Sequence, residues 1–339
     1  MGNGRFLESF WYVAAWSHEV EAKPFARRIL DVPVLMYRTQ DGVAVAMDER
    51  CPHRRAPLSM GRLRGDEIEC AYHGMRFAPD GACTHVPGQE HVQDAASNRH
   101  FPLIERHGFL WIWMGDAAGA DPDRIPEHYS VQTDPAWAGD GVMIHTRSHA
   151  LLIAENVLDL THASYLHART VGTDYVPETL PETVVESDHV AVSRGFVNVK
   201  NPSTFVKIMG FEMADREQVI HFWPPGYCLL EMNVRPAGAT DPGEERRMVV
   251  LSPITPETEK SHHQFLCFYR NFELHNPKLT EVMMDEVYRT ALEDTEMLEA
   301  QQRNMDDDPP DYHQVNLRVD QGPIAARRMV EKLLAEQVS

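Results

Sequence analysis

Cysteine is scarce in this chain of 339 residues, and long apolar runs are missing. The 5 cysteines are scattered and show no pairing pattern of the kind found in secreted disulfide-bonded scaffolds, so we expect a reducing compartment. No apolar stretch approaches the roughly 20 residues of a membrane-spanning helix, and the first residues contain no apolar signal core. The sequence therefore predicts a cytoplasmic protein with no membrane partner.

Basic residues are in the minority, and a dinucleotide-binding fingerprint is missing. The chain has 32 Lys and Arg against 51 Asp and Glu, a formal net charge of −19. This balance argues against a nucleic-acid partner, which requires a basic surface; it suits a solvated acidic surface or docking to a partner with a basic face. No glycine-rich turn follows a predicted strand in the dinucleotide-binding pattern. Any nicotinamide or flavin is therefore expected on a separate protein.

Two short segments, Cys51-Pro-His53 and Cys70-Ala-Tyr-His73, each combine one cysteine with one histidine. They are separated by 16 residues, and Gly74 follows the second segment, where it permits a tight bend. Two Cys and two His in this arrangement are the ligands of a Rieske [2Fe–2S] cluster, in which thiolates hold one iron and imidazoles hold the other. The motif predicts a chain that handles single electrons.

A structural zinc site is the alternative for the same four residues, because two Cys and two His also form zinc fingers. Zinc fingers pair like ligands, two Cys first and two His later, whereas each segment here mixes the two kinds. Mixed segments favour the cluster.

The chain is expected to form two domains, residues 1–120 and 121–339. Residues 10–115 are rich in strand patterns, and 117–126, rich in Gly, Asp and Pro, is the predicted linker. The fold class is α+β: an all-β domain, then a larger domain with an antiparallel sheet and helices. The later elements are a helical segment near 150–167, strands between 183 and 272, and a helix over about 279–304.

The helical segment contains two histidines, His162 and His167, that are candidate ligands of a second metal. At i and i+5 they point apart on an ideal helix, so both reach one ion only if the helix ends or bulges between them. Periodicity alone favours packed or capping histidines instead.

Asp294 supplies a candidate third ligand on the last predicted helix. A buried carboxylate is costly unless it is paired with a cation, so a metal or a buried arginine is expected beside it. Glu293 and Glu296 lie off the buried stripe and require no such partner. Two histidines and one carboxylate form the facial triad that binds Fe(II) and leaves positions open for oxygen. The buried stripe of this helix contains Met283, Val287, Ala291, Asp294 and Leu298.

The cluster loops, the Asn156-x-x-Asp159-x-x-His162-x-x-x-x-His167 segment and Ala-Leu-Glu-Asp294 together resemble the oxygenase component of Rieske non-haem iron monooxygenases. The resemblance covers nearly the whole chain and points to the group of vanillate O-demethylase, dicamba O-demethylase and toluenesulfonate methyl-monooxygenase. It implies a helix-grip catalytic domain and two iron centres. The implied cluster ligands are Cys51, His53, Cys70 and His73, and the implied Fe(II) ligands are His162, His167 and Asp294.

The resemblance also implies roles for two further residues, Asp159 and Asn156. Asp159 would join a cluster histidine of one subunit to an iron-ligand histidine of the next, in a head-to-tail homotrimer; an ordinary helix Asp is the alternative. We expect Asp159 to share a helix face with His162 and Asn156, one turn earlier, to line the approach to the iron. A separate reductase or ferredoxin would deliver electrons from NAD(P)H through a flavin.

The strand region 225–272 is expected to wall the substrate pocket. Apolar and aromatic walls with one or two polar anchors suit a small aromatic acid. Arg235 is a candidate for bidentate pairing with a carboxylate or sulfonate, although an exposed strand position is the alternative. The candidate substrate residues are Asn233, Arg235, Ser252 and Phe265.

The predicted reaction is O₂-dependent O-demethylation of a methoxylated aromatic acid, giving a phenol and formaldehyde. The alternatives within the family are hydroxylation of the methyl group of a methylated or sulfonated aromatic compound and ring hydroxylation of a phthalate-like acid. A Rieske electron carrier is the alternative of another class, but it needs no second metal.

Overall fold

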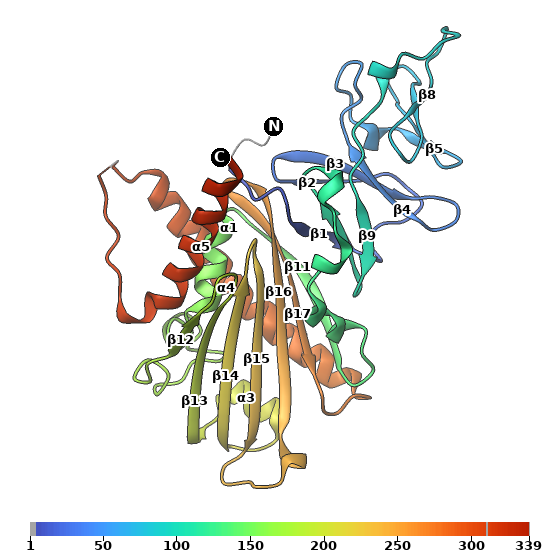
Figure 1. The fold of residues 1–339 in the computed structure, drawn as a ribbon. Helices are drawn as coiled ribbons and strands as arrows, with labels where there is room; N and C mark the ends of the chain where they lie inside the picture. Colours follow the sequence, from blue (N-terminus) through green and yellow to red (C-terminus); the bar gives the residue numbers. More distant parts are fainter. Residues whose placement is uncertain (1–4, 310, 339) are drawn as a thin grey trace. The chain divides into compact units, whose positions relative to one another are not determined.

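The computed structural model describes residues 5–309 and 311–338 and divides the chain into two compact units (Figure 1). Unit 1 contains the residues up to Glu127 together with Thr255–Thr258; unit 2 contains His128–Ile254 and the residues from Glu259 onward. The expected class, an all-β region followed by a region of antiparallel sheet and helices, is confirmed. The boundary after residue 120 stays a prediction about independent folding.

Unit 1 consists of short antiparallel strands in three sheets, ordered β1-β10-β9, β2-β3-β4 and β5-β6-β7-β8. Strand β3 belongs to two cores: Val34 and Met36 pack in one, while Leu35 and Tyr37 pack in the other. This follows from the period of two along a strand. The strands are β1 Trp11–Trp16, β2 Phe25–Ile29, β3 Val32–Arg38, β4 Ala44–Asp48, β5 Arg62–Arg64, β6 Glu67–Glu69, β7 Arg76–Phe77, β8 Cys83–His85, β9 Leu103–Arg106 and β10 Phe109–Trp113.

Unit 2 is built on a seven-stranded antiparallel sheet with the order β11-β17-β16-β15-β14-β13-β12. Its strands are β11 Ala138–Thr146, β12 Glu182–Val185, β13 Val190–Lys200, β14 Met213–Trp223, β15 Tyr227–Pro236, β16 Arg246–Thr258 and β17 Ser261–Arg270. The helices are α1 Ala150–Leu158, α2 Ala163–Leu166, α3 Ser203–Met209, α4 Pro277–Asp306 and α5 Gln321–Val338.

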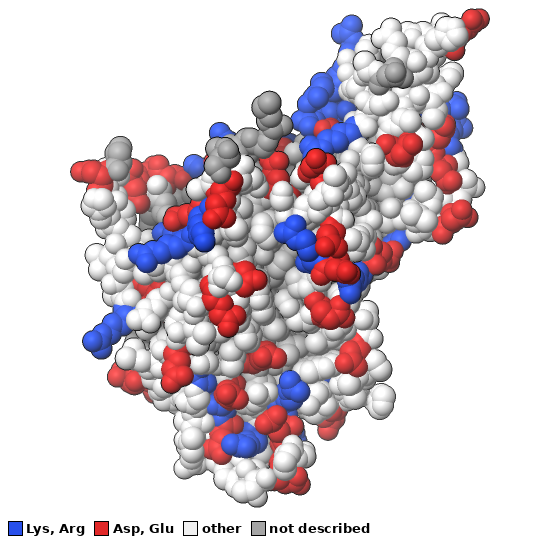
Figure 2. Space-filling model, in the orientation of Figure 1, with Lys and Arg blue, Asp and Glu red and all other residues white. Residues whose placement is uncertain are grey.

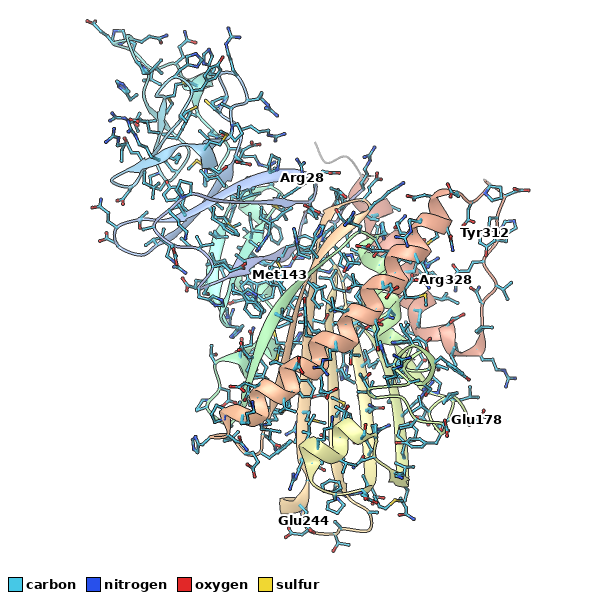
Figure 3. All side chains as sticks on the ribbon, turned by 180° about the vertical axis from the view of Figure 1, so that it is seen from behind. Arg28, Met143, Glu178, Glu244, Tyr312 and Arg328 are labelled. Carbon is cyan, nitrogen blue, oxygen red and sulfur yellow. The ribbon has the colours of Figure 1, made fainter. Side chains whose placement is uncertain are left out.

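Helix α4 lies across one face of this sheet, as the view from behind shows (Figure 3). Asn276 caps its first turn, with the side-chain oxygen accepting from the Leu279 N–H at 3.1 Å, and Pro277 occupies the first turn. Met283 of α4 packs in one core cluster with Met232 and Val234 of β15. We call this side of the sheet the α4 face. Because side chains alternate along a strand, the strand residues next in sequence to Met232 and Val234 face the opposite side.

Charged side chains of both signs are interspersed over the face of the molecule drawn in Figure 2. Within the described residues, no helix has both the length and the apolar character needed to cross a membrane.

Candidate metal centres

The two Cys/His segments of unit 1 form loops with the same backbone geometry. The N–H of the residue four positions after each cysteine donates to the cysteine carbonyl, at 2.8 Å from Arg55 to Cys51 and at 3.0 Å from Gly74 to Cys70. Both donors have left-handed backbones, with φ of +61° at Arg55 and +69° at Gly74. The glycine adopts this conformation without cost, whereas Arg55 adopts it against its steric preference. Each loop therefore presents its cysteine in the same way.

The four candidate cluster ligands form two pairs, the two thiols buried and the two imidazoles exposed. Cys51 and Cys70 are each 2% exposed and belong to one core cluster. The rings of His53 and His73 lie with their centroids 4.6 Å apart, and both residues are exposed. Burial, opposed by the His53 N–H and reinforced by the Cys70 thiol, raises the pKa of Cys51 to about 11. A thiolate at this position therefore requires a cation, and the donor set fits a cluster held by two thiolates and two imidazoles.

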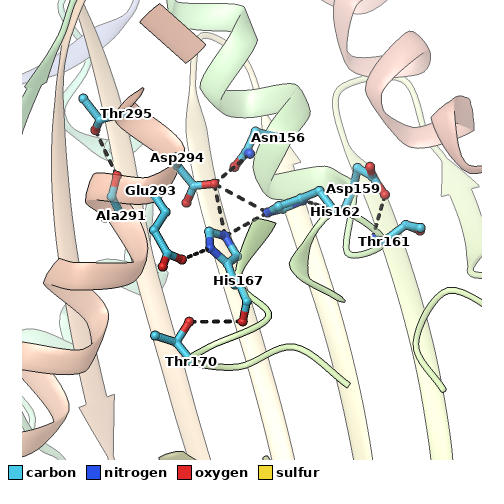
Figure 4. A network of polar contacts seen from close by, with 10 residues as sticks. All are labelled: Asn156, Asp159, Thr161, His162, His167, Thr170, Ala291, Glu293, Asp294 and Thr295. Carbon is cyan, nitrogen blue, oxygen red and sulfur yellow. Dashed lines mark hydrogen bonds and ion pairs between the residues drawn. The ribbon is translucent and has the colours of Figure 1, made fainter. Parts of the chain in front are cut away.

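In unit 2, the structure brings His162, His167 and Asp294 together (Figure 4). One ligand atom from each lies within 4.8 Å of the others. Asp294 Oδ1 is 3.1 Å from Nε2 of His167 and 3.6 Å from Nε2 of His162. The two Nε2 atoms are 3.2 Å apart. Three converging donors of this kind are a facial set for one divalent metal.

Each imidazole of this set has its other nitrogen engaged, which leaves Nε2 for the metal. Nδ1–H of His167 donates to Glu293 Oε2 at 2.7 Å, and Nδ1–H of His162 donates to the carbonyl of Asp159. Both Nε2 atoms then direct lone pairs at one another, an arrangement that a cation between them stabilises. Hydrogen bonds from the far nitrogen are the usual support of metal-bound histidine. The residues present therefore fit a mononuclear iron.

The pKa values of the two histidines shift in opposite directions. Burial is the main cause of the lowered pKa of His162. Burial also lowers the pKa of His167, but the hydrogen bonds and charges of Asp294 and Glu293 outweigh it, so its net shift is upward. Of the two imidazoles, His167 is thus the one held by carboxylates on both nitrogens.

The helical segment is also broken before His162, and this corrects one expectation, the placement of Asp159 on a helix face with His162. Helix α1 ends at Leu158 with Asp159 as its C-cap, and His162 and His167 are the N-cap and C-cap of the short helix α2. One turn between caps brings the two imidazoles to one side: the chain breaks after Leu158, ahead of the pair, and helix α2 ends at Leu166, between the two histidines, as expected. Asp159 and His162 do not share a helix face. The Asp159 carbonyl, not its carboxylate, accepts from His162, while its Oδ1 accepts from the Thr161 N–H at 2.7 Å.

The contacts of Asn156 and Glu293 both differ from those expected from the sequence. Asn156 Nδ2 donates to Asp294 Oδ1 at 2.9 Å, so it holds a candidate ligand in place instead of only lining an approach. Glu293, dismissed from the sequence because it lies off the apolar stripe, is the residue that orients His167. The signal that was missed is chemical: a metal-binding histidine needs an acceptor for its second nitrogen.

The four candidate substrate residues lie on different faces of the sheet. Ser252 is buried and accepts a 2.9 Å hydrogen bond from Gln264, on the α4 face. Asn233 and Arg235 alternate with the α4-face residues Met232 and Val234, so they face the opposite side, where Arg235 is exposed and pairs with Asp215 at 3.8 Å.

Phe265 is fully buried next to Leu266, which packs with Ala291 of α4, so Phe265 also faces away from the helix. Side-chain alternation thus removes Asn233, Arg235 and Phe265 from the face that α4 covers. Of the four, only Ser252 lies on the face that also carries Asp294, and the substrate contacts of all four stay a prediction.

Comparison with known proteins gives matches over both units. Residues 10–96 match the Rieske [2Fe-2S] domain, and residues 146–336 match the vanillate O-demethylase oxygenase C-terminal domain. A putative toluene-4-sulfonate monooxygenase system iron-sulfur subunit of Comamonas testosteroni is 38% identical, over 97% of each chain. A vanillate O-demethylase oxygenase subunit of a Pseudomonas species is 34% identical, over 98% of this chain and 96% of its own length. The dicamba O-demethylase oxygenase component of Stenotrophomonas maltophilia is 32% identical, over 97% and 98%.

Solved structures agree with this result. The crystal structure of dicamba monooxygenase bound to dicamba superimposes with a TM-score of 0.92 at 31% identity, over 98% of this chain and 99% of that chain. The structure of the same enzyme with non-heme iron and dicamba has a TM-score of 0.84 at 29% identity, over 98% and 99%.

Proposed function

Because the chain belongs to the Rieske oxygenases with a vanillate O-demethylase oxygenase C-terminal domain, we propose that it removes the methyl group of a methoxylated aromatic acid. The protein is a Rieske-type non-haem iron monooxygenase whose cofactors are a [2Fe–2S] cluster and a mononuclear iron. The observation that carries the proposal is the convergence of His162, His167 and Asp294 in a chain that also has a Rieske site.

The candidate ligands are assigned to the two metal groups by their donor chemistry. Cys51, His53, Cys70 and His73 hold the cluster, and His162, His167 and Asp294 hold the iron. When bound, the iron supplies the activation of O₂ for oxygen insertion into a C–H bond. The protein's own contribution is orientation: Glu293 and the Asp159 carbonyl direct the imidazoles, and Asn156 holds the carboxylate.

O-demethylation accounts for every atom with one O₂ and two electrons. The aryl methyl ether, O₂, two electrons and two protons give the phenol, formaldehyde and water. One oxygen atom enters the methyl C–H bond, and the resulting hemiacetal breaks its C–O bond to release formaldehyde. The other oxygen atom leaves as water. The relatives named for vanillate and dicamba O-demethylation support this reaction.

Hydroxylation of an aryl methyl group is the second candidate. The relative named for toluene-4-sulfonate, at 38% identity, favours it. The same machinery applied to a methyl group on carbon gives a stable alcohol, because that product has no oxygen leaving group. The two candidates therefore differ in a single observable, the release of formaldehyde.

Electrons reach the oxygenase from a separate reductase or ferredoxin that carries the flavin and oxidises NAD(P)H. Within the oxygenase, transfer runs between subunits of a homotrimer, from His73 of one to Asp159 of the next. The exposure of His73 suits a contact with another protein surface. The five cysteines are unpaired, which suits the reducing conditions of the cytoplasm.

The experiment is product analysis with purified protein, a surrogate reductase, NADH and a panel of methoxy-, methyl- and sulfo-benzoates. The proposal predicts formaldehyde in proportion to NADH oxidised, together with the corresponding phenol. A hydroxymethyl product without formaldehyde would favour the second candidate. NADH oxidation without any oxygenated product across the panel would contradict both.

A further inference from the structure

Three arginines are buried in unit 2, and one of them differs from the others in its partners. Arg194, Arg216 and Arg270 are 4%, 4% and 0% exposed. The terminal nitrogens of Arg194 donate to Thr161 Oγ1 at 2.6 Å and to the Val176 carbonyl at 3.2 Å. Those of Arg270 donate to four acceptors: the Ala138 carbonyl at 3.3 Å, Thr280 Oγ1 at 2.8 Å, the Glu273 carbonyl at 3.0 Å and the Asn276 carbonyl at 2.9 Å.

Nε is buried without a partner in all three arginines, but the Arg216 guanidinium alone makes no hydrogen bond or ion pair with any described residue. Its surroundings are three aromatic rings. Its Cζ lies 5.5 Å from the ring centroid of Tyr175, 5.1 Å from that of Phe196 and 5.3 Å from that of Phe205. Attraction to ring faces offsets only part of the cost of burying an unpaired cation. A buried guanidinium with no counter-ion among the described residues is suited to binding an anion.

Arg216 lies on the α4 face of the sheet. It alternates along β14 with exposed or half-buried residues, and two positions before it Ala214 packs in the core cluster that contains Met283 of α4. An anion bound to Arg216 would thus lie on the side of the sheet that carries the candidate iron ligands. Arg235, the arginine proposed from the sequence, faces the other side.

Two chains of contacts connect Arg216 to the candidate iron ligands. On β13, Phe196 pairs in register with Arg216, and two residues earlier Arg194 reaches Thr161, which directly precedes His162. Along the other route, Val171, four residues after His167, packs in the same cluster as Phe205, whose ring faces Arg216.

We propose that Arg216 binds the anionic group of the aromatic substrate, a carboxylate or sulfonate, with Tyr175, Phe196 and Phe205 packing around the paired groups. A guanidinium presents two parallel N–H groups that match the two oxygens of either anion. The surrounding rings exclude water and contact the apolar part of the ligand. This inference rests on the proposed function and names the residue, Arg216, that would select an aromatic acid over a neutral aryl ether.

The test is binding of matched acid and neutral probes to the oxidised holoprotein, measured by calorimetry. The probes are 3-methoxybenzoate, its amide 3-methoxybenzamide, and 4-toluenesulfonate. Arg216→Met should weaken binding of both anions by about 100-fold, the size expected for a buried charge-assisted pair, and leave the amide within about threefold of the wild-type value. Arg216→Lys keeps the charge without the bidentate geometry, so its affinity for both anions should lie between those of the wild type and Arg216→Met. Arg235→Met, at an exposed arginine on the opposite face, should bind all three probes as the wild type does.

Several outcomes would overturn the inference. They are equal weakening of the acid and the amide in Arg216→Met, wild-type affinity in that variant, and wild-type protein that binds the amide as tightly as the acid or binds no probe. If Arg216→Met does not fold, Arg216→Lys decides the question, since wild-type acid affinity in that variant contradicts a bidentate site.

Formaldehyde release separates this inference from the proposed function. Acid binding that depends on Arg216 without formaldehyde would leave the site intact and contradict O-demethylation. Formaldehyde release with the same KM in wild type and Arg216→Met would support O-demethylation and contradict the anion site at Arg216.

Discussion

The two candidate metal sites are enclosed in opposite ways. In unit 1 the ligands come from two adjacent loops, with Cys51 and Cys70 buried and His53 and His73 exposed. In unit 2 the histidine His167 is 2% exposed, and its partners come from a helix more than a hundred positions away in sequence. An exposed imidazole edge suits electron exchange with another protein, whereas a ligand set that is buried at His167 and half-buried at His162 and Asp294 suits a reaction that must exclude water. Histidine therefore has a different task in each unit, and the exposure of its side chain indicates which task it performs.

The largest expected effect is loss of the cluster while the second site survives. Replacing the buried ligand in Cys70→Ser should remove the visible absorbance of the cluster and its two irons, and abolish turnover driven by the reductase. Cys83→Ser, at a half-buried free cysteine of the same unit, should keep both colour and turnover. Absorbance and iron analysis measure the effect; a coloured Cys70→Ser protein would contradict the ligand assignment.

The proposed electron path from the cluster of one subunit to the iron of the next is tested at Asp159. Asp159→Asn should retain both metals and a reducible cluster, yet lose turnover by about 100-fold, because the amide does not accept imidazole N–H groups as a carboxylate does. Stopped-flow reduction of the cluster and steady-state turnover are the measurements. Unchanged turnover would show that this carboxylate does not bridge the two centres.

The hydrogen bond that supports the second site is tested at Glu293. Glu293→Gln should weaken the hydrogen bond that orients His167 and reduce iron affinity by about 10-fold, since outer partners of metal-bound histidines contribute on that scale. The matched control is Glu296→Gln, three residues along the same helix and exposed. Iron retention during dialysis against a chelator measures the difference. Equal loss in both variants would mean that Glu293 contributes only surface charge.

The buried histidine His262 lies outside both candidate ligand sets, and it tests the acid sensitivity of unit 2. Burial is the first cause, and the neighbouring His145, His149 and His263 contribute, in lowering its pKa to about 4. In the unfolded chain the value is about 6.5, so the unfolded state binds more protons within this window, and stability falls as the pH falls from about 6.5 to about 4.

Replacing this residue should therefore flatten part of the acid response. His262→Asn should remove up to about 3 kcal/mol of the pH-dependent change in the free energy of unfolding. Urea unfolding at several pH values measures it, with His91→Asn, an exposed histidine of unit 1, as the control. The same pH slope in wild type and His262→Asn would contradict a neutral buried imidazole.

Features set by neighbours in sequence could be predicted, whereas features set by packing could not. The cluster motif lies in two short segments separated by 16 residues, so its spacing alone predicts a metal and its candidate ligands. The long helix was predicted as about 279–304 and spans Pro277–Asp306, because its apolar stripe and cap are local. The position of the break ahead of His162 and the role of Glu293 depend on how α1, α2 and α4 meet, which no local pattern records.

The substrate residues illustrate the same limit. The guanidinium of Arg235 predicts pairing with a substrate anion, but alternation with Met232 and Val234 places Arg235 on the face of the sheet opposite α4. The pattern Ala214-x-Arg216-x-Gln218-x-Ile220 is an alternating strand with an arginine on the apolar face, a signal that was present in the sequence and was overlooked.

The most direct test of the account is Mössbauer spectroscopy of ⁵⁷Fe-loaded wild-type protein and Asp294→Ala. We expect two separate iron centres in one chain, with Asp294 belonging only to the second. Cluster signals should therefore appear in both proteins, and the wild type should show a mononuclear ferrous signal that is lost from Asp294→Ala. A mononuclear signal that persists in the variant, or a wild-type protein that has none, would contradict it.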